Sequence, residues 1–184
     1  MSTFPTTIGE AMYTVNNYLD SVDFSHPMTT ARRHIEMICD IADGKTVLEL
    51  GSHAGISATA IAMAGGIVTS VDLCDTISEQ QRVDYWKHHG VEITPWAGTA
   101  AAYLEHCEKY PDVVSFDIIF HDAMHGDRAF GEYMACANIC GTLVIHDFEQ
   151  LSTAGQVALK ACTASSIEDA DHLGRVLFIG RIRD

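Results

Sequence analysis

Carboxylates recur in this sequence at points where the chain leaves a short apolar run. Glu49 lies inside the segment Glu-Leu-Gly-Ser-His-Ala-Gly at 49–55, and Asp72, Asp122 and Asp147 each end such a run. Carboxylates can bind ribose hydroxyls or a hard divalent cation, and a nearby imidazole can accept a proton. His125, three residues after Asp122, supplies that imidazole. These residues indicate a site that binds a polar ligand and moves a proton.

The segment 49–55 has the spacing of a glycine loop between a strand and a helix. Gly51 and Gly55 lack side chains where the backbone turns, so a ligand could approach the main chain and the helix N-terminus. The dinucleotide fingerprint G-x-G-x-x-G is not matched, because His53 stands at its second glycine. Asp72 follows at the end of the next predicted strand, where a carboxylate can hold ribose hydroxyls.

Strands and helices alternate from residue 46 onward, and this alternation must position the site. The predicted strands are 46–50, 67–71, 91–96, 116–121, 142–146 and 175–182, and the predicted helices are 8–19, 28–41, 56–64, 76–90, 99–109, 127–137 and 152–161. Thr76 and Glu79 have capping-box spacing, and Asp127 is expected to cap its helix. The pattern predicts a doubly wound α/β fold with a parallel sheet, whose ligands bind beyond the carboxyl ends of the strands.

The 184 residues, 47% of them hydrophobic, are enough for one domain with a proper core. We expect a single domain over 1–184, in which N-terminal helices within 1–44 form a potential lid on a cofactor-binding core at 45–184. The net charge of −14 argues against nucleic acid and anionic membranes as partners, and favours small molecules or metal cations. The uncharged stretch 50–71 is interrupted by Gly65 and Gly66, so we expect no transmembrane segment.

The six cysteines form no C-x-x-C pair, and the N-terminal residues do not resemble a secretion signal. This usage predicts reduced thiols and a cytoplasmic protein.

Four motifs together resemble a known family. They are Glu-Leu-Gly-Ser-His-Ala-Gly-Ile-Ser at 49–57, Ser-Val-Asp at 70–72, the segment 116–125 with its D-x-x-H, and Gly-Thr-Leu-Val-Ile-His-Asp at 141–147. This set resembles class I S-adenosylmethionine-dependent methyltransferases, and within them the metal-dependent O-methyltransferases that act on small molecules such as catechols and sugars. The resemblance covers roughly residues 46–182. It implies a mostly parallel, seven-stranded Rossmann-like sheet with helices on both faces and a reversed last strand.

The resemblance also implies roles for individual residues. Asp122 and Asp147 would hold a divalent cation such as Mg²⁺ or Mn²⁺, and His125 would be the general base beside the catalytic Asp122. Asp72 would bind the ribose of S-adenosylmethionine, and Leu73 would pack on its adenine. The residues expected at the cofactor are Glu49, Gly51, Ser52, His53, Gly55, Asp72, Leu73, Gly98, Thr99 and Asp122.

The sequence departs from the family pattern next to Asp147. Phe148 stands where catechol-type enzymes usually carry Asn, and His146 stands where sugar-type enzymes often carry an acid. The pairs 121–122 and 146–147 could form a mixed nitrogen and oxygen site, with His146 as a ligand of Mn, Fe or Zn. Strand alternation instead points His121 and His146 away from the neighbouring aspartates and into the core.

Three functions are therefore compatible with the sequence. The first is methylation of a hydroxyl on a small-molecule acceptor, assisted by a divalent cation. The second is binding of S-adenosylmethionine or S-adenosylhomocysteine without turnover, which the short chain suggests because it has no insertion long enough for a substrate cap. The third is a metal-dependent hydrolase or oxygenase on the same scaffold. A homodimer that closes the pocket is a further expectation.

Overall fold

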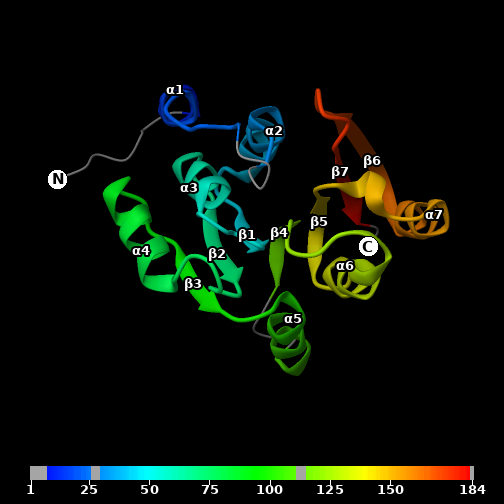
Figure 1. The fold of residues 1–184 in the computed structure, drawn as a ribbon. Coiled ribbons are helices and arrows are strands. Elements are labelled where there is room, and N and C mark those ends of the chain that lie inside the picture. Colours follow the sequence, from blue (N-terminus) through cyan, green and yellow to red (C-terminus); the bar gives the residue numbers. More distant parts are fainter. Residues whose placement is uncertain (1–7, 26–29, 111–114, 183–184) are drawn as a thin grey trace.

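The computed structural model describes residues 8–25, 30–110 and 115–182, and a seven-stranded mixed sheet forms its centre (Figure 1). The strand order is β3-β2-β1-β4-β5-β7-β6, with β1 to β5 parallel and β7 antiparallel to both of its neighbours. The strands are β1 (Thr46–Leu50), β2 (Ile67–Asp72), β3 (Thr94–Ala97), β4 (Phe116–His121), β5 (Cys140–Ile145), β6 (Thr163–Ala170) and β7 (Val176–Ile182). The predicted Rossmann-like methyltransferase fold with a reversed last strand is thus confirmed.

Helices cover both faces of the sheet in the part of the chain that is described. They are α1 (Ile8–Asp20), α2 (Arg32–Ala42), α3 (Ile56–Met63), α4 (Glu79–His88), α5 (Ala100–Lys109), α6 (Phe130–Ala137) and α7 (Thr153–Ala161), with short 3₁₀ turns η1 (Gly126–Ala129) and η2 (Phe148–Gln150). Two apolar clusters result. One joins α1, α2 and α3 to one face, and the other joins α5 and α6 to the opposite face.

Several element boundaries differ from the sequence prediction. Helix α4 begins later than expected, because Ser78 and not Thr76 forms the capping box, with Gln81. Asp127 does not cap a helix; it lies in η1, and its carboxylate accepts a hydrogen bond from the backbone N–H of Ser152. Helix α2 begins at Arg32, and the predicted start at 28–29 lies outside the described residues.

Strand β6 was not predicted at all. Its sequence, Thr-Ala-Ser-Ser-Ile-Glu-Asp-Ala, is almost entirely exposed at the edge of the sheet. An edge strand of this kind buries too little surface to show an apolar pattern. Its partner β7 holds it through antiparallel pairing along nearly its whole length.

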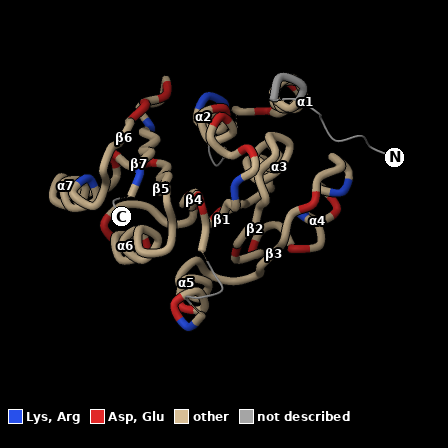
Figure 2. Tube along the Cα trace, turned by 180° about the vertical axis from the view of Figure 1, so that it is seen from behind, with Lys and Arg blue, Asp and Glu red and all other residues tan. Residues whose placement is uncertain are grey.

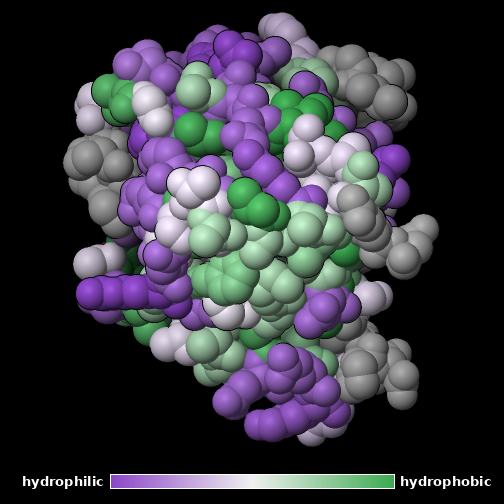
Figure 3. Space-filling model, turned by 90° about the vertical axis from the view of Figure 1, so that its right-hand side faces the viewer, coloured by the Kyte–Doolittle hydropathy of each residue, from purple (hydrophilic) through white to green (hydrophobic). Residues whose placement is uncertain are grey.

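Acidic positions are scattered over many elements and are not gathered on one of them (Figure 2). In the side view of Figure 3, weakly hydrophobic residues gather in the middle and hydrophilic residues surround them. None of the helices within the described ranges is long and apolar enough to span a bilayer. All six cysteines are free thiols.

Candidate functional site

A cavity of about 680 Å³ opens at the carboxyl ends of the parallel strands. The loops after β1, β2, β3, β4 and β5 all contribute to its lining, as does the segment that leads into β7. The strands converge there because they are parallel, so their carboxyl ends share one edge of the sheet. The sequence-predicted residues that line this cavity are Gly51, Ser52, His53, Asp72, Leu73, Gly98, Thr99, Asp122, His125, His146 and Asp147.

Asp72 fixes the glycine loop from the neighbouring strand. Its Oδ2 accepts hydrogen bonds from the backbone N–H groups of Ser52 at 2.9 Å and His53 at 2.8 Å. Its Oδ1 accepts one from the N–H of Cys74 at 3.0 Å. A carboxylate has about four lone-pair positions, so Asp72 can accept a further hydrogen bond from a ligand while it holds this loop.

Glu49 lies beneath the glycine loop and does not line the cavity, contrary to its expected position at the cofactor. Its side chain is completely buried, and it accepts hydrogen bonds from the hydroxyls of Ser57 and Ser70. Burial raises the pKa of Glu49 to about 7, although these hydroxyls oppose the rise. The residue therefore supports the loop from behind.

The two loop glycines are required by the packing of the chain itself. At Gly51, with φ of +90°, a Cβ would stand 2.5 Å from the backbone at Asp122 and Ala123. At Gly55, with φ of +82°, it would stand 2.5 Å from the indole nitrogen of Trp86. The sequence interpretation assigned this space to a ligand, whereas the tertiary structure fills it with the loop after β4 and with α4. Gly55 accordingly does not line the cavity.

The cavity offers suitable groups for S-adenosylmethionine. Ser52 is buried and lines the cavity, and among the described residues its hydroxyl makes no hydrogen bond of ordinary geometry, although it lies close enough to Glu49 to oppose the rise of that pKa. A buried hydroxyl without a partner is costly, and a polar ligand would supply one. Leu73 is 60% exposed where it lines the cavity, and gives the apolar contact that an adenine needs. The residues present therefore fit the cofactor that the resemblance implies.

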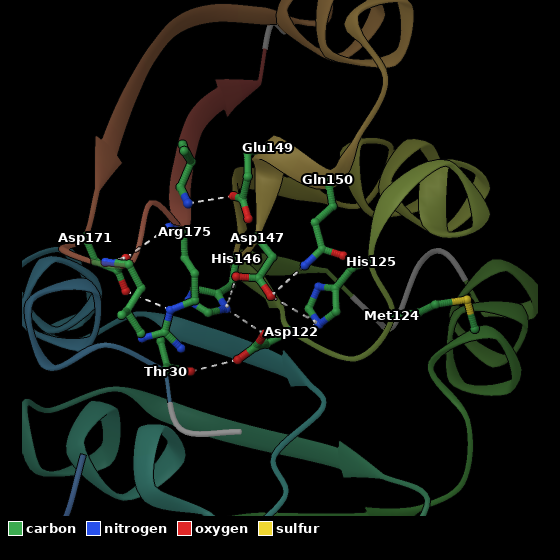
Figure 4. Close-up of polar contacts among 12 residues, drawn as sticks. Thr30, Asp122, Met124, His125, His146, Asp147, Glu149, Gln150, Asp171 and Arg175 are labelled. Carbon is green, nitrogen blue, oxygen red and sulfur yellow. Dashed lines mark hydrogen bonds and ion pairs between the residues drawn. The ribbon is translucent and has the colours of Figure 1, made fainter. Parts of the chain in front are cut away.

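A cluster of histidines and carboxylates forms the other part of the cavity (Figure 4). His146 Nδ1 lies 3.0 Å from Asp122 Oδ1 and 3.3 Å from Asp147 Oδ1. His125 Nε2 lies 3.9 Å from Asp122 Oδ1 and 3.8 Å from Asp147 Oδ2. The parallel pairing of β4 with β5 brings the two aspartates together. His146 N–H can thus donate to Asp122, while His125 is held close to both negative charges.

His146 does not point away from its neighbouring aspartate, so the strand-alternation interpretation was wrong for this residue. The reason is that β5 ends at Ile145 and Asp147 has a left-handed backbone with φ of +55°, so alternation no longer applies. His121 is the last residue of β4, and its side chain is buried in the core, as strand alternation predicts. Its ring packs on Tyr133, and its Nε2 lies 2.8 Å from Glu132 Oε2.

The carboxylates change the proton affinity of His146. Burial lowers its pKa, but the hydrogen bond with Asp122 and the charges of Asp122 and Asp147 outweigh burial, so the net pKa is raised. His34, whose ring packs edge-on against His146, shows the opposite shift. Burial, followed by the charge of His146, lowers the pKa of His34.

The side chains of the cluster, as they lie, do not fit a bound cation. In the described ranges, no group of three or more His, Cys, Asp or Glu side chains has the arrangement of a metal site. Asp122 accepts hydrogen bonds from Thr30 and His146, and Asp147 accepts one from Gln150. A cation between the aspartates would compete with these donors. Phe148, which replaces the Asn of catechol-type enzymes, is buried in the core and offers no oxygen.

Thr30 and Arg175 are among the cavity residues that the sequence did not indicate. Thr30 comes from the segment before α2 and donates its hydroxyl to Asp122 Oδ2 at 2.7 Å. Arg175 precedes β7, lines the cavity and donates from Nε to Asp171 at 2.7 Å. No local motif marks Thr30. Arg175 would have been found only if the β6–β7 hairpin had been predicted.

A seven-stranded Rossmann-like sheet with a reversed strand β7, and a cavity beside a glycine loop that Asp72 holds, is the architecture of a Rossmann-like methyltransferase. The family model described as O-methyltransferase matches residues 11–144. The chain belongs to this O-methyltransferase family. No curated protein matches the sequence significantly.

Solved structures show the same fold at low sequence identity. The O-methyltransferase TomG from Streptomyces achromogenes, in complex with SAM, is 15% identical with a TM-score of 0.67, and the match covers 100% of this chain and 92% of that chain. An O-methyltransferase from Bacillus cereus, in complex with SAH, is 14% identical with a TM-score of 0.64, covering 100% and 93%. A candidate SAM-dependent methyltransferase from Streptococcus mutans matches at 14% identity and a TM-score of 0.62. This match covers 81% of the present chain, which spans about half (48%) of that protein.

Proposed function

We propose that this protein transfers a methyl group from S-adenosylmethionine to a hydroxyl of a small molecule. The observation that carries the proposal is the single cavity that the Asp72-anchored glycine loop shares with the His125 cluster. A cofactor at the loop and an acceptor at the cluster would then be neighbours. Membership of the O-methyltransferase family supports the proposal.

The chain would hold the cofactor through groups on three adjacent strands. Ser52 and His53 after β1 would hold its methionine part, Asp72 and Leu73 after β2 its ribose and adenine, and Gly98 with Thr99 the adenine edge. When bound, S-adenosylmethionine supplies a methyl group on a positively charged sulfur, which an oxygen nucleophile displaces in line. The chain must therefore orient the acceptor oxygen and remove its proton.

His125 is the proposed general base. Its ring is partly exposed at the cavity and its Nε2 lies within 3.9 Å of both Asp122 and Asp147, whose charges stabilise the imidazolium formed on proton transfer. His146 and Thr30 would hold Asp122 in place by donating hydrogen bonds to its two oxygens. Asp122 and His146 thereby act as positioning residues for the base.

A calorimetric titration with S-adenosylmethionine and S-adenosylhomocysteine tests the proposal most directly. We expect micromolar binding of both, and no binding would contradict the assignment. Parallel titrations with Mg²⁺ or Mn²⁺ test the cation that the sequence predicts at Asp122 and Asp147, although the hydrogen bonds of these two side chains do not favour it. Cofactor affinity or methylation activity that requires the ion would support the predicted cation. The same affinity and activity in the presence of a chelator would refute it.

His125→Ala tests the base. In a screen of catechol and sugar acceptors, we expect kcat to fall by about 100-fold while KM for S-adenosylmethionine changes little. His88→Ala, which removes an exposed histidine on α4, is the control and should leave both constants unchanged. An unchanged kcat in His125→Ala would exclude this histidine as the base.

The other expectations give distinct results in these experiments. Cofactor binding without methylation of any acceptor favours the binding-protein alternative. Tight metal binding without cofactor binding favours the hydrolase or oxygenase alternative. A small-molecule acceptor, the absence of nucleic-acid and membrane partners, a cytoplasmic location and a homodimer stay predictions.

A further inference from the structure

Cys74 and Arg82 form a pair beside the cavity that the proposed reaction does not use. Arg82 lies on α4, and its Nη2 donates to Cys74 Sγ at 2.8 Å. Cys74 directly follows Leu73 and precedes Asp75 and Thr76, all three of which line the cavity. Cys74 does not itself line the cavity, but its neighbours in the chain border the part expected to hold adenosine.

Arg82 is an unusual partner because it is completely buried. Its exposed fraction is 0%, and its Nε and Nη1 find no hydrogen-bond partner within the described ranges. A buried guanidinium normally pairs with a carboxylate, because an uncompensated buried charge is strongly unfavourable. Here the recorded acceptor is a sulfur, and the ring of Trp86 lies 5.8 Å from the guanidinium carbon.

The backbone holds the sulfur in this position. Cys74 has a left-handed backbone with φ of +59°, and its N–H donates to Asp72 Oδ1 at 3.0 Å. The residue is only partly buried, and we therefore expect a small reagent to reach its sulfur. An adjacent guanidinium stabilises the anionic form of a cysteine sulfur, and this form is the nucleophile.

The other cysteines lack this environment. Burial raises the pKa values of four of them: Cys39, Cys107, Cys136 and Cys140. Cys162 is partly buried like Cys74, but among the described residues its sulfur bonds only to the carbonyl oxygen of Ala158. Cys162 is therefore an internal control with similar access and no cation.

We propose that Cys74 is a modification site, at which a small disulfide forms a mixed disulfide that obstructs the neighbouring end of the cavity. The Cys74 thiolate attacks one sulfur of the reagent, a new S–S bond forms and the original S–S bond breaks. Cys74 is oxidised, the released sulfur is reduced, and the proton lost by Cys74 passes to the leaving thiolate. Arg82 stabilises the attacking sulfur, and a group attached to Cys74 would lie beside Leu73 and Asp75.

The test uses the whole protein treated with oxidised glutathione near neutral pH, with peptide mass spectrometry at each cysteine. We expect Cys74 to be modified at least about threefold faster than Cys162, since only Cys74 has an adjacent guanidinium to stabilise negative charge on the attacking sulfur. Arg82→Met should reduce the Cys74 rate to that of Cys162, and Arg82→Lys should preserve most of it. The proposal is overturned if Cys74 and Cys162 react at equal rates in the natural sequence, or if Cys74 still reacts fast in Arg82→Met. If Arg82→Met does not fold, the ratio of the Cys74 rate to the Cys162 rate, measured in the natural sequence and in Arg82→Lys, tests the proposal instead.

The proposed obstruction of the cavity by a group on Cys74 rests on the proposed function, and a separate binding measurement tests it. Glutathionylated protein should lose S-adenosylmethionine binding, whereas Cys74→Ser exposed to the same reagent should retain it. Retained affinity in the modified protein overturns the obstruction. If untreated protein does not bind S-adenosylmethionine, the proposed function fails, while the labelling ratio still tests Cys74 independently.

Discussion

At the scale of single residues, the site depends on two carboxylates with opposite surroundings. Asp72 is partly exposed and accepts backbone hydrogen bonds from the loop, so its charge is well solvated by the chain. Glu49, beneath the same loop, has no exposed surface. One carboxylate can therefore bind a ligand, and the other supports the loop at a cost in stability near neutral pH.

Replacing Asp72 by Ala should reduce affinity for S-adenosylmethionine by at least about tenfold, because charge-assisted hydrogen bonds to the loop and to the ligand are both lost. Titration calorimetry measures this change. Asp75→Ala, at an exposed cavity residue three positions later, is the matched control and should have a much smaller effect. Undiminished affinity in Asp72→Ala would be inconsistent with a ribose-binding role.

Glu49 predicts a defined pH dependence of stability. Its pKa rises from 4.5 to about 7 in the fold, so its favourable contribution is complete below the lower value and is lost as pH rises through the higher one. As pH rises between these two values, the protein should lose up to about 3 kcal/mol of unfolding free energy relative to the Glu49→Gln variant. Urea unfolding of both proteins at several pH values in this range measures the difference. The same pH dependence of the unfolding free energy in both would contradict the prediction.

At the scale of elements, the β1 loop and α4 depend on each other. The absence of a side chain at Gly55 makes room for the indole of Trp86, which packs into the core at 1% exposure. Trp86 belongs to the same helix as Arg82. Helix α4 therefore supports the glycine loop from behind and positions Arg82 against Cys74.

Gly55→Ala should destabilise the protein by more than its backbone strain alone. Gly90→Ala provides the comparison, because Gly90 also has positive φ, at +72°, but no atom lies within 4 Å of its Cβ position. We expect about 1–2 kcal/mol for Gly90→Ala from strain, and a clearly larger loss for Gly55→Ala because Trp86 must move. Thermal and denaturant unfolding measure the stability of both variants. Equal losses of unfolding free energy would show that Trp86 can move aside at no cost in stability.

At the scale of the whole molecule, the N-terminal helices are part of the main core. Val15 and Leu19 of α1 and Ile35 and Ile38 of α2 are buried in the same cluster as Val47 of β1. The ion pair between Arg33 and Asp169 also joins α2 to β6. A lid role for residues 1–44 stays a prediction, and any such motion must keep this packing.

Ile38→Ala should cost about 2–5 kcal/mol of unfolding free energy, as expected for a large residue removed from a core. Ile41→Ala is the matched control on the same helix, since Ile41 is 37% exposed and should cost well under half as much. Chemical denaturation compares the two. Similar small losses would mean that α2 is docked only loosely.

Local sequence was sufficient for the alternating elements, the strand ends and the glycine loop after β1, because apolar runs and glycine spacing reflect backbone geometry over a few residues. It placed β1 and β4 at their observed bounds and identified Asp72 and Asp122 at strand ends. Strand β6 was not accessible in this way, because an exposed edge strand needs no apolar pattern.

Only the tertiary structure decided how the site is built. It turned His146 toward Asp122, brought Thr30 and Arg175 to the cavity, and filled the space at Gly51 and Gly55 with the chain itself. It also placed Arg82 against Cys74. These are contacts between segments far apart in sequence, and their geometry depends on how β4, β5, α4 and the β6–β7 hairpin pack. The sequence by itself therefore determined most of the strand-end residues that line the cavity, because strand ends are local features. Packing determined which of them touch and which residues from distant segments join them.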